Sequence, residues 1–437
     1  MLSRRHFLTA SGAAVATGTA AQTLAATGAD QDKTTPAQDI DRSTAIYVPG
    51  YYAGSAWANG KRVVEHPVLA RGLKPNDEHA RLLSRIGLDG SIRQAVLPVH
   101  AHDVAVSPDR SVGILCGFNS GGHVAFDPDT LDVAALGAPF KKGWNGGGHA
   151  QFLPDGQGVL LSERAPFKSL RHTIESHHGR ITIREPSTMR ILESYSTHGI
   201  DPHDIRLVED GRYLVIANYG SVIEKTSGKK AVPRRVVEAS ITTIEVASGR
   251  LVDKQLTGAE DTELRHLAAA GRDSVFAIQA LLGDEESLAR QTEFDDILYE
   301  ADITTSRDSP YLSAATLRFS GNGAPPAEMG NEAATKLMRH GLSIKYDAKH
   351  HQVIASYPTT HRVMVFDAAE GALLHIIDTS AMGLRYPCGV TLLPDDTHYA
   401  VTGFWENLFV FERGTHRLVR DLCLYPMFFG HSHITAA

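Results

Sequence analysis

Cysteine is scarce in this chain, with only three among 437 residues. An odd and small number does not suit a disulfide framework. Beyond the N-terminal region, no apolar run approaches the roughly 20 residues that a membrane-spanning helix needs. We therefore do not expect an integral membrane protein. The net charge is a modest −7, which excludes the strongly basic surface typical of nucleic-acid-binding proteins.

The familiar local motifs of several enzyme classes are also absent. The chain has no Gly-x-Ser-x-Gly elbow, no His-Glu-x-x-His pair and no Cys-x-x-Cys-His sequence. These absences argue against an α/β-hydrolase, a zincin protease and a c-type haem protein. Whether the protein is an enzyme stays undecided at this point.

The N-terminus has the pattern of an export signal. Arg4 and Arg5 are followed by Phe7, Leu8 and a weakly apolar stretch of small residues. This pattern resembles a twin-arginine (Tat) signal, although the basic start of an ordinary Sec signal is the alternative. We expect a signal peptide over residues 1–26, a flexible linker over 27–43 and a periplasmic protein. A Tat substrate crosses the membrane already folded, so a metal could be loaded in the cytoplasm.

The remainder of the chain repeats one eight-residue pattern. Each copy starts with a strand-like run and ends at an Asp that predicts a turn. Apolar residues alternate within most copies, as in Val104 and Val106 or Val390 and Leu392, which is the period of a half-buried strand. The copies are residues 102–109, 148–155, 203–210, 266–273, 340–347 and 388–395.

Further short strands follow these copies before the pattern restarts. Four antiparallel strands per repeat are typical of propeller blades. The N-terminal part supplies three strands without an opening one, near residues 45–48, 80–84 and 92–97, and the chain ends in one unaccompanied strand. We predict an all-β, seven-bladed β-propeller over residues 44–437, closed by pairing of the C-terminal strand with the N-terminal blade. Closure also removes strand edges that would invite aggregation.

Several of these residues also carry a family resemblance. The segment 196–204 (Ser-Thr-His-Gly-Ile-Asp-Pro-His-Asp) resembles a signature of the bacterial family named domain of unknown function 1513. Residues 147–152, Arg265 with His266, 388–390 and His433 fall where that family's other motifs are expected. The resemblance covers most of the chain after about residue 44. It implies an exported propeller, often encoded near periplasmic iron-acquisition proteins, with a metal-linked role and no defined activity.

The chain departs from the family pattern at two insertions, residues 53–79 and 219–237. The second is basic. Either insertion could alter a partner surface or a lid.

The opening positions of the repeats are rich in histidine. In a propeller the innermost strand of each blade lines the central channel, so these side chains can converge near one mouth. Imidazole nitrogen and thiolate sulfur are good ligands for iron, copper and zinc. Asp103 and Asp204 follow two of the histidines and could orient their rings. The predicted metal-binding residues are His102, His149, His203, His266, His340, Cys388 and His433.

A structural role for the same residues is the alternative, because a histidine at a strand start can stabilise the seam between blades. Three functions therefore remain open. The first is a periplasmic metal-binding propeller, accessory to iron or copper handling, with periplasmic metal-uptake proteins as partners. The second is a metal-dependent enzyme of lactonase or oxidoreductase type, and the third a protein-interaction scaffold without metal. We expect a monomer that binds no nucleic acid.

Overall fold

The computed structural model describes residues 41–53, 57–58, 61–62, 79–99, 101–118, 121–166, 173–223, 234–282, 311–321, 323–404, 407–424 and 433–437. The chain divides into two units, and all described residues belong to the second, Pro36–Ala437. The predicted signal peptide, residues 1–26, and most of the linker, 27–43, lie outside the described residues.

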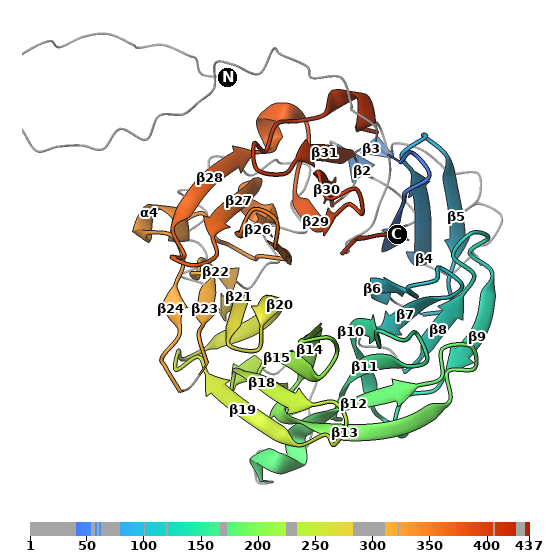
Figure 1. The fold of residues 1–437 in the computed structure, drawn as a ribbon, viewed down its shortest axis with the longest axis vertical. Helices are drawn as coiled ribbons and strands as arrows, with labels where there is room; N and C mark the ends of the chain where they lie inside the picture. The colour runs from blue at the N-terminus through green and yellow to red at the C-terminus, as the bar shows by residue number, and fades with distance from the viewer. Residues whose placement is uncertain are drawn as a thin grey trace, which may run out of the picture. The chain divides into compact units, whose positions relative to one another are not determined.

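The second unit is a ring of antiparallel sheets, which confirms the predicted seven-bladed propeller (Figure 1). We number the blades by their innermost strands. Blade 1 contains β6 (Ala101–Val106), β7 (Gly113–Gly117), β8 (His123–Phe126) and β9 (Val133–Gly137). Blade 2 contains β10 (Asn145–Phe152), β11 (Val159–Arg164), β12 (His178–Arg184) and β13 (Ile191–Ile200). Blade 3 contains β14 (Pro202–Val208), β15 (Tyr213–Asn218), β18 (Ser240–Glu245) and β19 (Leu251–Leu256).

The second half of the ring follows the same plan. Blade 4 contains β20 (Thr262–Gly271), β21 (Ser274–Leu282), β23 (Leu317–Phe319) and β24 (Ala327–Glu328), with β22 (Tyr311–Leu312) as an extra partner of β21. Blade 5 contains β25 (Ser343–Asp347), β26 (Gln352–Tyr357), β27 (Arg362–Asp367) and β28 (Leu373–Asp378). Blade 6 contains β29 (Pro387–Leu392), β30 (His398–Gly403) and β31 (Leu408–Glu412). Blade 7 contains β32 (Thr435–Ala436), β1 (Ala45–Ala53), β4 (His79–Gly87) and β5 (Ile92–Val96).

Besides blade 4 with its extra strand, two blades depart from the simplest plan. Blade 7 joins the two ends of the domain, because β32 pairs with β1 as the sequence predicts. Blade 6 has three named strands, and its fourth position is held by isolated bridges from Phe411 to Leu418 and from Leu408 to Leu424.

The remaining described elements are short. Helices are few and brief: η1 (Ile174–His177), α4 (Glu332–Thr335), η3 (Pro358–Thr360), η4 (Ser380–Met382) and η5 (Arg420–Leu422). Two hairpins lie in the predicted insertions: β2 (Trp57–Ala58) with β3 (Lys61–Arg62), and β16 (Ser221–Ile223) with β17 (Arg234–Val236). Most other residues of these insertions lie outside the described part. In that part no helix is long and apolar enough to cross a membrane.

The predicted aspartate turns form in the expected way. Asp109 accepts a hydrogen bond at its Oδ1 from the amide of Ser111, at 3.0 Å. Asp155 and Asp395 make the same contact with the amide two residues later, each at 2.9 Å. A carboxylate that caps its own turn explains why Asp ends these copies of the pattern.

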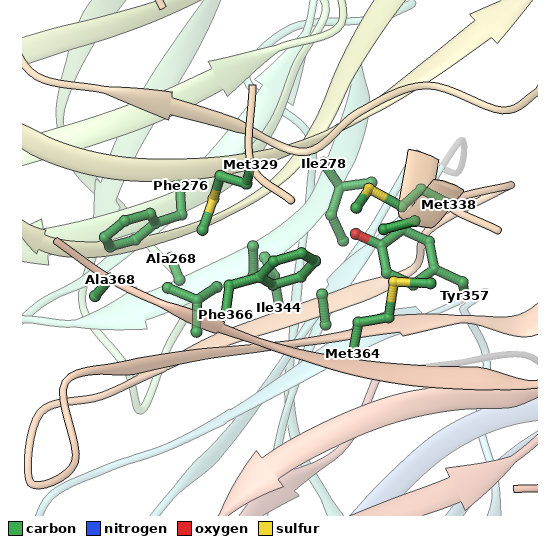
Figure 2. Packing of buried hydrophobic residues seen from close by; sticks show 13 residues of the cluster. Ala268, Phe276, Ile278, Met329, Met338, Ile344, Tyr357, Met364, Phe366 and Ala368 are labelled. Carbon is green, nitrogen blue, oxygen red and sulfur yellow. The ribbon is translucent and has the colours of Figure 1, made fainter. Parts of the chain in front are cut away.

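The core is divided among the seams between blades. Figure 2 shows the seam of blades 4 and 5, where Phe276 and Ile278 pack against Ile344 and Phe366. All four side chains are 1% exposed or less. Burying one such side chain contributes about 1.5–3 kcal/mol, so each blade depends on its two neighbours for stability. The channel side chains are therefore held by a rigid scaffold.

Candidate metal centre

The innermost strands share a local irregularity where the histidines lie. In β6, Ala101 pairs with Gly117 and Asp103 with Cys116, which leaves His102 as an extra residue. The same kind of register shift occurs in β10, β14, β20 and β29. A β-bulge of this kind re-aims a side chain and often stands beside a functional site.

The largest register shift among the innermost strands lies in blade 2, beside His149. The shift in β10 spans Gly146 to Ala150 and includes Gly148, whose φ is +102°. A Cβ at Gly148 would lie 3.0 Å from the ring of Phe118 and 3.2 Å from His102. Glycine is therefore required here, and it is His149, not the glycine, that occupies the ligand position.

Five of the predicted ligands converge. Their candidate ligand atoms all lie within 4.8 Å of one another, and all five residues are buried. Ring centroids of His266 and His433 are 4.3 Å apart, and those of His149 and His203 are 4.5 Å apart. Four members come from blades 1 to 4 and the fifth from the C-terminal segment. The cluster consists of His102, His149, His203, His266 and His433.

Two carboxylates orient the ring of His149. Its Nδ1 lies 3.0 Å from Oδ2 of Asp103 and 3.2 Å from Oδ1 of Asp204. Asp204 also lies 3.8 Å from Nδ1 of His266. An Nδ1–H that donates to carboxylate leaves the Nε2 lone pair of His149 free to bind a cation. The two aspartates therefore act together on a histidine that is adjacent to neither of them in sequence.

His203 is oriented by backbone. Its Nδ1 donates to the carbonyl oxygen of Gly147 at 2.5 Å, which leaves Nε2 as an acceptor. The Nε2 atoms of His149, His203 and His266 are buried, and within the described part of the chain they have no hydrogen-bond partner. A buried polar atom without a partner costs about 1–3 kcal/mol. Three such atoms that converge indicate a binding site.

The protonation states suit a cation. Burial lowers the pKa of His203 and that of His266 well below the usual value, and the neighbouring histidines lower both further. Burial alone would raise the pKa of Asp103, but the hydrogen bond from His149 and the charges of Lys345 and Arg206 hold it below its usual value. At neutral pH the site thus combines neutral imidazoles with an ionised carboxylate, as metal binding requires.

A further contact within the cluster joins the C-terminal segment to blade 1. Nε2 of His433 lies 2.9 Å from Nε2 of His102. Two imidazole nitrogens on opposite sides of a transition metal lie about 4.2 Å apart, since each bond is about 2.1 Å. Five donors within 4.8 Å of one another therefore match the size of one ion after small shifts.

Two predicted ligands are not part of this cluster. His340 precedes β25, which pairs with β26 without a bulge, and its φ is +53°. Cys388 lies on the bulge of β29 but is buried with Leu342, Tyr386 and Phe404. Burial raises the pKa of the Cys388 thiol well above its usual value, so the thiolate that metals bind is disfavoured. The described residues of blades 5 and 6 thus present no ligand to the cluster.

Sequence reasoning missed an aromatic layer against the histidines. Phe118 stacks on His102 with ring centroids 4.7 Å apart and an interplanar angle of 23°. Tyr219 lies against His203, with centroids 4.6 Å apart. Both aromatic residues follow a second strand of a blade. No periodic signal marks such loop positions.

Two guanidinium groups complete this layer. Arg164 and Arg265 lie 5.4 Å and 5.3 Å from the ring centroid of Tyr219, within range of a cation–π interaction. Arg164 also forms an ion pair with Asp201. Asp201 lies in the segment 196–204, and its φ is +60°. That segment therefore supplies both a cluster histidine and the partner of Arg164.

Comparisons with known proteins agree with the fold. Residues 95–410 match the family model described as "Protein of unknown function (DUF1513)". No curated protein matches the chain. Among solved structures, a hydrazine synthase from Kuenenia stuttgartiensis is 13% identical with a TM-score of 0.51, covering 77% of this chain and 92% of that chain. A Bacteroides uniformis protein assigned as a 6-phosphogluconolactonase is 11% identical with a TM-score of 0.51, covering 91% and 100%. Similarities this distant show the propeller fold alone.

Proposed function

The chain belongs to the DUF1513 family of proteins of unknown function, and we propose that it is an exported metalloprotein that binds one transition-metal ion at the five-histidine cluster. One observation carries the proposal. One candidate ligand atom from each of the five histidines converges on the same place, and the buried Nε2 atoms of His149, His203 and His266 have no hydrogen-bond partner among the residues that the structure describes. A seam of structural histidines would instead satisfy these nitrogens with neighbouring groups.

The donor set favours iron or copper as the metal. Imidazole is a good ligand for iron, copper, nickel and zinc. Structural zinc is almost always four-coordinate, whereas this cluster offers five nitrogens. An ion that accepts five or six ligands uses the whole set. This supports a role in the handling of iron or copper, with periplasmic metal-uptake proteins as the expected partners.

Charge compensation also supports a cation. Five neutral imidazoles leave the charge of a divalent ion unbalanced. Asp103 and Asp204 provide two buried carboxylates against His149, and Asp204 also approaches His266. Carboxylates in this position increase the basicity of the ligating imidazole and stabilise the bound ion.

The N-terminal Arg4–Arg5 pattern supports export to the periplasm by the Tat route. Folding before export allows the cytoplasm to select the metal. A buried site is well suited to this order of events, because the ion then crosses the membrane inside the folded propeller.

Metal titration of the apoprotein tests the proposal. The wild-type chain, stripped by chelation and free of any histidine tag, should bind one equivalent of Co²⁺, whose absorption spectrum reports its ligands. The double variant His203→Gln/His266→Gln should bind none. His340→Gln is the matched control, since it removes a histidine from the same place in the repeat but outside the cluster, and it should bind as the wild type does.

Either of two results would count against the site. One is a wild-type chain that binds no Co²⁺, Cu²⁺ or Fe²⁺, which would favour the interaction scaffold. The other is a double variant that binds metal as tightly as the wild type. Turnover that depends on the bound metal would extend the proposal to an enzyme.

A further inference from the structure

The C-terminal segment, residues 433–437, closes the ring through few contacts. Its strand β32 is only two residues long and pairs with β1 at Ile46 and Tyr47. The other innermost strands have five or more residues. The strand that closes the ring is therefore the shortest of the described innermost strands.

Hydrogen bonds connect the segment to three blades at once. The Thr435 hydroxyl donates to the carbonyl of Val104 in blade 1, at 2.6 Å. The Ala436 amide donates to Oγ1 of Thr391 in blade 6, at 3.3 Å. The Ala437 amide donates to the carbonyl of Ala45 in blade 7, at 2.9 Å. The segment lies where the last blade meets the first.

Close packing fixes the segment just beyond its histidine. Ile434 is fully buried in the seam of blades 6 and 7. A Cβ at Gly389 of β29 would lie 2.9 Å from the side chain and the backbone nitrogen of Ile434. Gly389 thus provides the space that the segment occupies.

His433 connects this packed segment to the histidine cluster. Its amide donates to the carbonyl of His102 at 3.2 Å, and its Nε2 faces Nε2 of His102 at 2.9 Å. Its ring also lies 4.3 Å from that of His266. The last histidine of the chain is therefore held among ligands that begin 331 residues earlier.

We infer that the bound metal has a further, structural function: it fastens the C-terminal segment to blades 1 to 4 and so locks the ring closed. This rests on the proposed metal binding. A metal that bridges His433 and His102 cross-links distant parts of the chain, and cross-links that close long loops restrict the unfolded chain most. Because the complete site exists only in the closed ring, metal binding and closure stabilise each other.

Amide hydrogen exchange on the full chain tests the inference. Saturating Co²⁺ should slow exchange of the amides of residues 433–437 by about tenfold or more relative to the apoprotein, because opening of the segment then requires loss of a ligand. In His433→Gln, Co²⁺ should still bind through the four remaining histidines without slowing exchange in this segment. His149→Gln is the matched control: it also loses one ligand, but the slowing should persist.

Gly389→Ala provides a second variant that touches no ligand. The added methyl group should displace Ile434 and with it His433, so Co²⁺ affinity should fall by about tenfold. Gly121→Ala is the control, because a Cβ there meets no atom within 4 Å, and its affinity should be unchanged.

Failure of the fastening role and failure of metal binding give different results. If the wild type binds one Co²⁺ but exchange of residues 433–437 is unaltered, the fastening role is wrong and metal binding stands. Slowing in His433→Gln equal to that in the wild type would also refute the fastening role. If the wild type binds no metal, both proposals fall.

Discussion

At the scale of single residues, the orientation of each imidazole decides what the cluster can do. His149 is turned by Asp103 and Asp204, and His203 by the carbonyl of Gly147. In both cases Nδ1 is engaged and Nε2 is left for a ligand. Such orientation of the rings would reduce the cost of binding the proposed cation.

Asp204→Asn tests this orientation. The amides of Ile205 and Leu267 donate to different oxygens of Asp204, so asparagine keeps an acceptor for one of them while it removes the negative charge beside His149 and His266. Loss of such a supporting carboxylate typically lowers metal affinity by about 10–100-fold. Competition with a chromogenic chelator measures the change. Asp155→Asn, in an exposed turn, should leave the affinity unaltered, and an Asp204→Asn affinity equal to wild type would refute the role of this carboxylate.

A histidine away from the cluster gives a pH prediction. Burial, reinforced by His375 and His350, lowers the pKa of His416 to about 4. Between pH 6.5 and 4 the imidazole of His416 is therefore protonated in the unfolded chain but neutral in the folded protein. The free energy of unfolding falls as the pH decreases through this window. His416→Gln should lessen the fall in Tm between pH 7 and pH 4.5, as followed by circular dichroism. The exposed His351→Gln is the control; equal pH dependence in His416→Gln and the wild type would contradict the assignment.

At the scale of elements, the bulged inner strand is the unit that makes the site. The bulge adds a residue at His102, and comparable shifts include His149, His203 and His266. The bulge also leaves backbone carbonyl groups outside the ladder of hydrogen bonds between the strands. Ser162 in β11 donates to the carbonyl of His203 at 2.8 Å. In β26, Ser356 does the same for Cys388 at 2.6 Å. The element thus recurs even where no ligand is presented.

Packing between elements should dominate stability. Phe366→Ala empties a fully buried position in the seam of blades 4 and 5 and should lower the free energy of unfolding by about 3–5 kcal/mol. Leu136→Ala, at a side chain 63% exposed on β9, should change it by less than about 0.5 kcal/mol. Denaturant unfolding of both variants measures the difference. Similar losses in the two would contradict the seam-based account of the core.

The sequence predicted strand positions better than side-chain directions. Period-2 alternation and the Asp turns are local, so the blades and their closure followed from them. The position of His433 followed from counting blades. The absence of His340 from the cluster could not be predicted in this way. Its strand has no bulge, and a bulge depends on pairing with the neighbouring strand, which the local sequence does not show. The environment of Cys388 depends on Leu342 and Phe404 in two blades, and the alignment of Asp103 with His149 depends on the seam between blades.

At the scale of the whole propeller domain, the C-terminal segment that closes the ring lies at the channel. Figure 1 shows the C-terminus beside the innermost strands, near β29 and β6. The segment that closes the ring also supplies a histidine to the cluster. Closure and ligand geometry are thus properties of the complete ring, and neither can form in a fragment of it.

The metal content of the exported protein tests the central claim most directly. Protein purified from the periplasm without a tag or added metal should contain one iron or copper ion per chain, and X-ray absorption should show a shell of about five imidazole nitrogens at about 2.1 Å. The double variant His203→Gln/His266→Gln, exported in the same way, should contain none. A wild-type protein without metal, or a double variant with the same metal content, would contradict the account.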